Sequence, residues 1–440
     1  MVARRLPGDR QVWHIAAPMI LSNVSVPLLG MVDTGVTGHL DSPTYLGAVA
    51  IGSTIFGFLY TGMNFLRMGT TGIAAQCYGA NDNDGLRVSL GQAATVALLI
   101  AVALIAVQVP VGRFAMGLIG AEADVEVSAL QYFSIRIWSA PGTLVNYVLI
   151  GWFLGLQNAR VPLLIFLTIN ITNIVLDLFF VMGLGMKVDG VALASVIAEY
   201  GGLAVGLSFA ANALHKRAGH WPFGRVFNIR AYSAFFSVNA HLFIRTTLLM
   251  FTFAFVTAQG ARLGGLVLAA NAVLMNLQLL TSFALDGFAH AAEALVGKAV
   301  GQKNREALER SVQLALKWSL AFAVGFCVFY VLAGPLLIRV LTDLSEVRET
   351  ALRYLPWLII SPLISVWSFL YDGVYVGATR AREMRNIMAL STFFVFLPAW
   401  FLLQGYGNHG LWAAFTLFMA SRGIGMHVGY RRQVLRSIVT

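Results

Sequence analysis

Residues 129–160 read ALQYFSIRIWSAPGTLVNYVLIGWFLGLQNAR, and residues 351–382 read ALRYLPWLIISPLISVWSFLYDGVYVGATRAR. Aligned from 129 on 351, the two segments are identical at nine of 32 positions, which include a GxxxG motif in each. The same shift along the chain aligns GAND at 79–82 with GQKN at 301–304. This constant offset predicts that the chain consists of two similar halves, in which the GxxxG motifs allow close contact between helices.

The composition is that of a membrane protein. Of 440 residues, 58% are hydrophobic and 11% are charged, which is less than half of the ~25% that is usual in soluble domains. These values exclude a soluble globular enzyme and a disordered chain. They also argue against a nucleic-acid binder, although the net charge is +10, because few of the basic residues cluster. Since a spanning helix needs ~20 apolar residues, the length allows many spans.

Apolar windows between charged or Gly/Pro/Asn breaks predict twelve transmembrane helices, and hence an all-α polytopic membrane protein. The expected spans are 12–40, 46–72, 88–110, 128–156, 161–183, 188–213, 231–258, 267–296, 311–333, 349–378, 385–404 and 409–430. Lys and Arg gather on the side of the chain ends, so the positive-inside rule places both termini in the cytoplasm.

Twelve spans divide into two lobes of six. We expect the first lobe at 1–213, a polar cytoplasmic linker at 214–230 and the second lobe at 231–440. Because six is an even number, the second half enters the membrane from the same side as the first. The two repeats are then parallel, which is a transporter architecture.

Several ionisable side chains lie inside the expected spans, where charge is costly. They are Asp33, Arg67, Arg136, Asp177, Glu199, Arg245, Asp286, Glu293 and Asp372. Arg67 and Glu293 lie near cytoplasmic ends, where their charged groups can reach water. Arg245, Asp286 and Asp372 are candidates either for structural partners in the second half or for a substrate cavity.

The fifth helix carries the clearest polar face. Asn170, Asn173 and Asp177 follow the spacing i, i+3, i+7, which places them on one side of a helix. Such a face on an apolar helix must point inward. Asp177 lies ~9 Å below the outer end of its helix, and Ser195 of the sixth helix lies at a similar depth.

The first helix places Asp33 at the same depth, with Thr37 on the same face. The internal repeat aligns Asp33 with Phe255 and Asp177 with Ala399, so the second half lacks both carboxylates. Burial and a neighbouring carboxylate both favour the neutral, protonated form of such a group. These residues therefore predict a proton-coupling site, and the alternative is a hydrogen-bond network that only holds the lobe together.

Pro27 lies six residues before Asp33 and removes a backbone hydrogen bond inside the first helix. It is a candidate hinge, or alternatively the cause of a static kink. The chain contains no metal-ligand spacing, nucleotide-binding loop or nucleophile motif, and Cys77 and Cys327 form no CxxC. We therefore expect no cofactor and no enzymatic activity. Transport would be driven by an ion gradient.

Several segments resemble those of the multidrug and toxic compound extrusion (MATE) family. PMILSNVSVPLLGMVDTGVTGHL at 18–40 and NITNIVLDLFFVMGLGMKVDGVALASVIAEY at 170–200 are similar to family motifs. LDGFAHAAEALVGKAVG at 285–301 and YDGVYVGATRAREMRN at 371–386 are similar to its DinF-like bacterial branch. The similarity extends over nearly the whole chain.

The resemblance implies a V-shaped pair of six-helix lobes and the export of cationic or amphipathic compounds, driven by a cation gradient. It assigns proton or cation coupling to Asp33, Asn173, Asp177 and Ser195. The substrate cavity is expected to include the following residues: Thr37, Asn146, Asn170, Asp286 and Asp372. The protein would be a monomer in the bacterial inner membrane that binds small drugs and no nucleic acid.

Three alternatives differ from proton-coupled export. A sodium-coupled exporter of the same fold would use the same oxygens, since Asp33, Asn173, Asp177 and Ser195 are hard ligands. A lipid-linked sugar flippase of the same superfamily is disfavoured, because such proteins usually have more helices and a strongly basic cavity. An intramembrane enzyme is disfavoured by the missing metal and nucleophile motifs.

Overall fold

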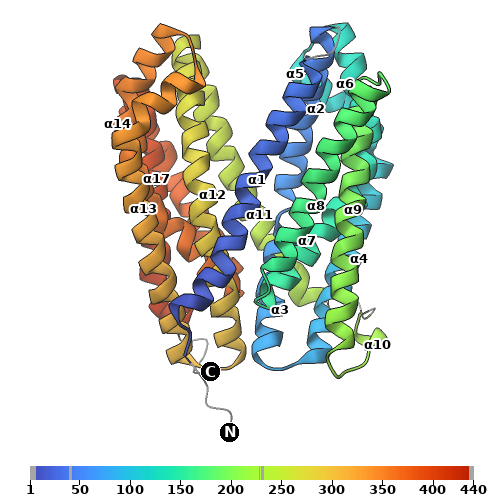
Figure 1. Cartoon of the computed structure of the whole chain (residues 1–440). Coiled ribbons are helices and arrows are strands. Elements are labelled where there is room, and N and C mark those ends of the chain that lie inside the picture. The colour runs from blue at the N-terminus through green and yellow to red at the C-terminus, as the bar shows by residue number, and fades with distance from the viewer. Residues whose placement is uncertain (1–5, 39–41, 227, 229–231, 436–440) are drawn as a thin grey trace. The chain divides into compact units, whose positions relative to one another are not determined.

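The computed structural model describes residues 6–38, 42–226, 228 and 232–435, with the side chains of 26–31, 33, 34, 37, 223 and 234 left out. Helices form this part of the chain, and it contains no β-strand (Figure 1). Ten of its helical segments are long and apolar enough to cross a bilayer. The first and last long helices, of 29 and 26 residues, also exceed the ~20 residues that a crossing needs.

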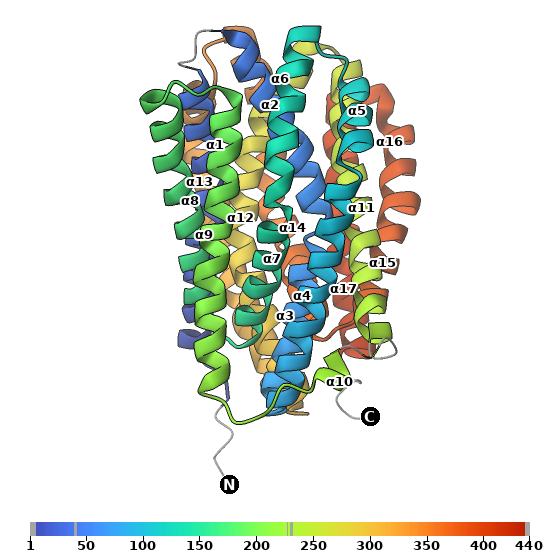
Figure 2. The ribbon, with the colours of Figure 1, turned by 90° about the vertical axis from the view of Figure 1, so that its right-hand side faces the viewer.

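The helices of the first half match the first six expected spans, several of which are broken into two pieces. Their bounds are α1 (Asp9–Thr37), α2 (Pro43–Gly62), α3 (Phe65–Gly79), α4 (Asn83–Ala106), α5 (Gln108–Ile119), α6 (Ala123–Arg136), η1 (Ile137–Ser139), α7 (Ala140–Gly155), α8 (Arg160–Asp177), η2 (Leu178–Gly183), α9 (Val188–His215) and α10 (Phe223–Val226). The pairs α2–α3 and α6–α7 each continue along one line, and α2 packs beside α6 (Figure 2).

The helices of the second half match the remaining six spans. Their bounds are α11 (Tyr232–Arg262), α12 (Gly265–Gly301), α13 (Arg305–Leu341), α14 (Ser345–Gly377), α15 (Ala381–Leu390), η4 (Ser391–Phe396), α16 (Leu397–Leu403), η5 (Gln404–Tyr406) and α17 (Asn408–Gln433). The fifth helix of each half includes a π-helical turn, η2 or η4.

The chain divides into two compact units, which differ slightly from its two halves. Residues 21–236 form one unit, and residues 1–20 together with 237–440 form the other. The chain therefore crosses between the units inside α1 and inside α11. Below, the first unit means residues 21–236, and the second unit means the remainder.

The internal repeat is visible in the backbone of each unit. Asp82 caps the start of α4 by accepting from Gly85 N at 2.8 Å, and Asn304 caps α13 by accepting from Ala307 N at 3.0 Å. The repeat aligns these two caps with each other. Positive φ angles recur at equivalent positions, at 57° and 50° for Asn81 and Lys303 and at 61° and 53° for Gln157 and Thr379. The repeat predicted from sequence is therefore confirmed within the two units.

The GxxxG motifs lie at close helix contacts, as predicted. A Cβ atom at Gly151 or Gly155 would come within 3.0 Å of α3 atoms, which include the carbonyl oxygens of Arg67 and Thr71. Gly373 and Gly377 of α14 lie in the same way against the carbonyls of Ala289 and Glu293 in α12. The contacting residues occupy equivalent positions of the repeat, so the two units use the same kind of close helix–helix packing.

The predicted linker packs on helices of the first unit. Arg87 of α4 donates from Nη2 to the carbonyls of Leu214, at 2.9 Å, and Arg217, at 2.8 Å. Gln92 of α4 donates to the carbonyl of Arg225 at 3.3 Å. These bonds satisfy carbonyls at and beyond the end of α9, which would otherwise lack intrahelical partners.

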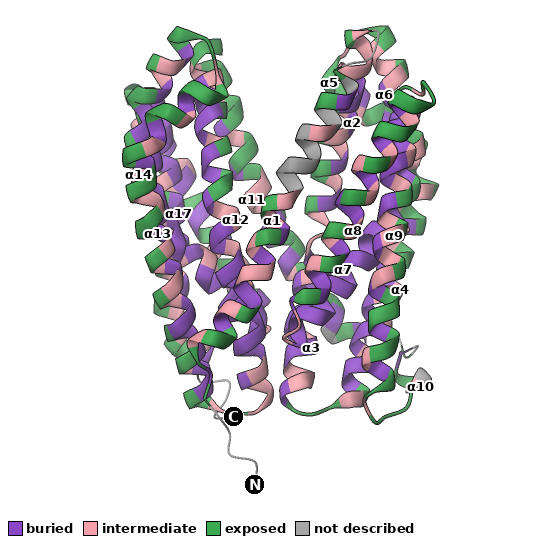
Figure 3. Cartoon of the chain, viewed as in Figure 1, coloured by how far each residue is buried: buried purple, intermediate pink, exposed green. Residues whose placement is uncertain are grey.

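Burial separates an interior from an apolar exterior in each unit (Figure 3). Buried residues lie where helices of the same unit face one another. Many exposed residues are large and apolar, such as Leu332 at 78% and Leu402 at 82%. Apolar exposure on this scale is typical of surfaces that contact lipid, not water.

Candidate functional site

Three polar residues of α8 lie inside the first unit. Asn170, Asn173 and Asp177 expose 7%, 1% and 0% of their surface. Asn170 donates from Nδ2 to Ser25 Oγ at 2.7 Å and to the Ser25 carbonyl at 3.3 Å. The polar face predicted from sequence is thus buried, and its first residue joins α8 to α1.

Ser195 of α9 links three helices. Asn173 of α8 donates from Nδ2 to Ser195 Oγ at 3.2 Å. Arg136, the last residue of α6, donates from Nη1 to the same oxygen, also at 3.2 Å. A hydroxyl oxygen has two acceptor lone pairs, so these two donors engage both of them.

Arg136 brings a positive charge into this cluster. Its guanidinium carbon lies 5.4 Å from the centre of the Phe56 ring and 5.6 Å from the centre of the Tyr132 ring. Nη1 of Arg136 also donates to the Tyr132 hydroxyl. Aromatic faces stabilise a cation that has lost water. The arginine is therefore held by rings as well as by hydroxyl groups.

A second carboxylate lies one helical turn beyond Ser195. Asn146 of α7 donates from Nδ2 to Glu199 Oε2 at 3.0 Å and to the Glu199 carbonyl at 2.9 Å. Arg136 attracts this carboxylate electrostatically. Asn146, predicted as part of a substrate cavity, therefore contacts an acid of the same unit.

Three predicted site residues lie outside the described side chains. They are the acid Asp33, the cavity residue Thr37 and the hinge Pro27. The backbone of α1 is helical at all three positions. Their proposed roles stay predictions.

The second unit has its own buried charge cluster. Asp372 of α14 accepts at Oδ2 from Arg422 Nη2 of α17 at 2.7 Å, and from Arg245 Nη2 of α11. Residue exposures are 8% for Asp372, 8% for Arg245 and 3% for Arg422. Asp286 of α12 is close enough to act electrostatically on Arg422. The two predicted cavity acids of this unit thus share a cluster with two arginines.

Sequence reasoning named Arg245 together with Asp286 and Asp372, and Arg245 donates to Asp372. It assigned no role to three other members of these clusters, Arg136, Glu199 and Arg422. Arg136 and Glu199 were visible as charges inside apolar spans, but their spacing did not show which residues they would face. Arg422 falls in the expected span 409–430, and its charge there was the available signal. These three residues contact partners on other helices, which a helical period cannot reveal.

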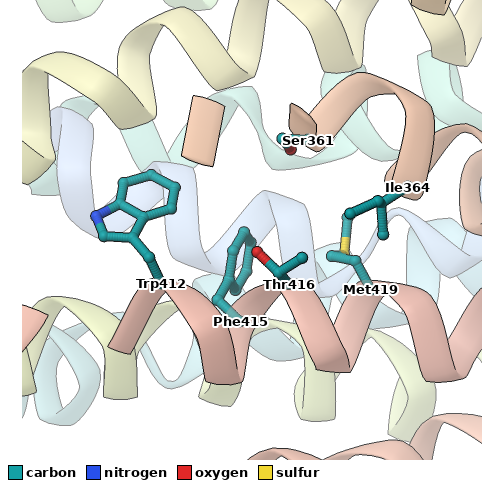
Figure 4. Close-up of a pocket in the computed structure, with 6 residues that line it drawn as sticks. All are labelled: Ser361, Ile364, Trp412, Phe415, Thr416 and Met419. Carbon is teal, nitrogen blue, oxygen red and sulfur yellow. The ribbon is translucent and has the colours of Figure 1, made fainter. Parts of the chain in front are cut away.

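The pocket between α14 and α17 is too narrow for a ligand. Its lining includes Ser361, Trp412, Phe415 and Met419 (Figure 4). It has no room for a water molecule, so we interpret it as a packing defect. Among the described residues, no group of three or more His, Cys, Asp or Glu side chains could hold a metal ion.

Residues 18–179 and 242–401 match the family model MatE, one block in each half of the repeat. The chain belongs to the MatE family. It is 43% identical over 425 residues to "DNA damage-inducible protein F" of Escherichia coli (strain K12), covering 97% of this chain and 92% of that protein. It is 24% identical over 442 residues to "Multidrug resistance protein MdtK" of Edwardsiella ictaluri (strain 93-146), covering 96% of this chain and 95% of the relative.

Solved structures of MATE transporters share the fold of this MatE-family chain. A MATE protein in a bent conformation has a TM-score of 0.90 at 18% identity, covering 98% of both chains. The Vibrio cholerae MATE transporter VcmN in its bent form has a TM-score of 0.85 at 21% identity, covering 98% of this chain and 97% of VcmN. The predicted all-α fold of twelve spanning helices in two lobes is confirmed. The family consists of membrane efflux proteins, so the chain is a transporter and not an enzyme.

Proposed function

We propose that this MatE-family chain exports cationic or amphipathic small molecules in exchange for protons. The coupling site would be the polar cluster of the first unit that contains Asn173 and Ser195, and we assign Asp177 and the predicted acid Asp33 to the same site. The multidrug resistance proteins among its relatives support the substrate class. The protein would act as a monomer in the bacterial inner membrane, with both termini in the cytoplasm.

The engagement of Ser195 Oγ by two donors favours protons over sodium. Sodium needs five or six oxygens that converge on it, and Ser195 could contribute one only by displacing Arg136 or Asn173. The guanidinium of Arg136 would also repel a second cation at this place. A proton needs only one carboxylate that titrates, and Asp33 and Asp177 are the candidates.

The mechanism follows from charge at Asp33. In the ionised state the carboxylate would attract a cationic substrate. Protonation would remove this attraction, and Pro27 would let α1 bend and expel the compound. Drug and proton would then compete for the protein. Asp177, fully buried on α8, would belong to the same proton-carrying network.

The deciding experiment is efflux from liposomes that contain the purified protein. One arm imposes a pH gradient without sodium, and the other imposes a sodium gradient with the pH clamped equal on both sides. We expect efflux only in the first arm. Sodium-dependent efflux with none from a pH gradient would overturn the proton assignment in favour of the sodium-coupled alternative.

Variants of the two acids test the site itself. Asp33→Asn should fold and fail to export, and Asp177→Asn should lower transport and shift its pH profile. Asp343→Asn is the matched control, since this carboxylate is fully exposed and its loss should leave efflux unchanged. Wild-type efflux by Asp33→Asn would remove the acid from the mechanism.

A further inference from the structure

An apolar groove runs along α13 in the second unit. Leu280 of α12 lines it together with five residues of α13: Ala321, Phe322, Gly325, Phe326 and Phe329. Its volume is about 500 Å³, which lies within the ~300–1,000 Å³ of small-molecule sites. The nearby hydroxyl of Tyr330 forms hydrogen bonds with Thr281 Oγ1 and the Leu277 carbonyl, each at 2.6 Å. It therefore has little capacity left to form a hydrogen bond with a ligand.

Gly325 gives the groove its depth. Glycine in the interior of a helix is less stable than alanine, so it usually marks a position where a Cβ would clash. A Cβ at Gly377 would clash, whereas a Cβ at Gly325 would have no atom within 4 Å. Close helix packing therefore does not explain this glycine. Because Gly325 has no side chain, the groove is open between Phe322 and Phe329.

The groove begins just inside one membrane interface. Trp318 donates from Nε1 to Asp9 Oδ1 at 2.7 Å, and Trp residues that have such polar partners are typical of the interface. Phe322 and Phe329 follow Trp318 by four and eleven residues, which places the groove ~6–17 Å deeper along the helix. This range corresponds to the hydrocarbon layer of a single leaflet, which is ~15 Å thick.

The entrance of the groove carries excess positive charge. Lys317 donates from Nζ to Asp9 Oδ1 at 3.0 Å, and its side chain is 59% exposed. Arg310, also exposed, acts electrostatically on the same acid. Two cations therefore act on one anion at the end of the groove where we place the lipid headgroups. This balance is complementary to an anionic headgroup.

We propose that the second unit binds an anionic phospholipid, with one acyl chain in the groove at Gly325 and the phosphate at Lys317 and Arg310. Apolar walls at this depth exclude water and fit a hydrocarbon chain. The bound chain would fill a void that the helices leave open, and so stabilise the packing of α13 on α12. The proposal depends on the membrane-spanning fold and is independent of which ion drives transport.

Native mass spectrometry of the purified protein tests this proposal. The protein is released from micelles that contain equal amounts of phosphatidylglycerol and phosphatidylcholine with identical acyl chains. Wild-type protein should retain phosphatidylglycerol preferentially. Gly325→Leu places a side chain in the groove, where the added Cβ has no atom within 4 Å, and should lose the retained lipid.

Gly57→Leu is the matched control. Gly57 of α2 is also exposed, and a Cβ added there would have no atom within 4 Å, but it is not one of the residues that line the groove along α13. This variant should retain lipid as the wild type does. Lys317→Gln should keep lipid binding and lose the preference for phosphatidylglycerol.

A thermal shift assay shows whether the variants are folded. Added phosphatidylglycerol should raise the melting temperature of the wild type and of Gly57→Leu, but not that of Gly325→Leu. Wild-type retention by Gly325→Leu would overturn the assignment of the acyl chain. Equal retention of the two lipids by wild-type protein would overturn the assignment of the headgroup.

Discussion

Arg422 Nη2 lies 2.7 Å from Asp372 Oδ2 in the interior of the second unit. Arg245 donates to the same carboxylate oxygen, so this one acid accepts from two guanidinium groups. Both arginine side chains are almost fully buried, at 3% and 10% exposed. Loss of the acid would leave two cations in an environment that solvates them poorly.

We therefore predict that Asp372→Asn strongly destabilises the protein. Removal of one partner of a buried ion pair costs ~3–5 kcal/mol, whereas loss of an exposed pair costs ~0–1 kcal/mol. Melting temperatures in detergent can compare Asp372→Asn with Arg305→Gln, whose pair with Glu309 is exposed at 57% and 39%. A similar melting temperature for the two variants would contradict the prediction.

We predict that efflux depends on the hydroxyl oxygen of Ser195 and that it tolerates an added methyl group at this position. Ser195→Ala removes the acceptor that Arg136 and Asn173 share, and loss of a hydrogen bond of this kind costs ~0.5–1.5 kcal/mol. We expect reduced efflux from Ser195→Ala at equal expression, and efflux near the wild-type rate from Ser195→Thr. If alanine and threonine behave alike, the hydroxyl has no role in the network.

The stability of the contact between α1 and α13 should depend on pH. Hydrogen bonds from Lys317 and Trp318 lower the pKa of Asp9 below its usual value of ~3.9. Because the folded pKa is lower than the unfolded one, the ionised carboxylate stabilises the fold above about pH 4. This contribution is lost as the pH falls through the folded pKa.

Asp9→Asn should therefore melt at a lower temperature than the wild type at pH 7, and the difference should shrink below about pH 4. Thermal unfolding of both proteins between pH 3 and pH 7 measures it. Trp318→Phe removes one of the two donors and should show a smaller change of the same sign. A difference that is independent of pH would show that the charge of Asp9 is not responsible.

Gly377 should not tolerate a side chain. A Cβ would overlap the Glu293 carbonyl, and overpacking of this kind costs ~1–3 kcal/mol. Gly377→Ala should lower the melting temperature, whereas Gly57→Ala, with open space around it, should be neutral or slightly stabilising. Equal stability of the two variants would argue against a close α12–α14 contact.

Sequence patterns were sufficient for the repeat, the spans and the glycine contacts. Each depends on spacing along one helix or on a constant offset, and both can be read from the chain. The polar face of α8 was visible for the same reason, as Asn170, Asn173 and Asp177 repeat at the helical period. The depth estimate also brought Ser195 to the level of this face.

The partners of the charged residues were not predictable in this way. Which side of α6 faces α9 decides that Arg136 bonds Ser195, and that orientation depends on packing between helices distant in sequence. Asp372 and Arg422 likewise lie 50 positions apart, on α14 and α17. One sequence gives the depth of such residues but not the angle at which two helices meet.

The chain passes from one unit to the other inside α1 and inside α11, so a cut in the linker between the two halves does not separate the units. A cut between residues 218 and 220 would give two fragments of six spans each, but neither would contain a complete unit. The amino-terminal fragment would carry away Trp13, whose ring packs 5.4 Å from Phe288 and 5.1 Å from Trp318. Fragment complementation would therefore require each piece to supply part of the other's interior, as in domain-swapped proteins.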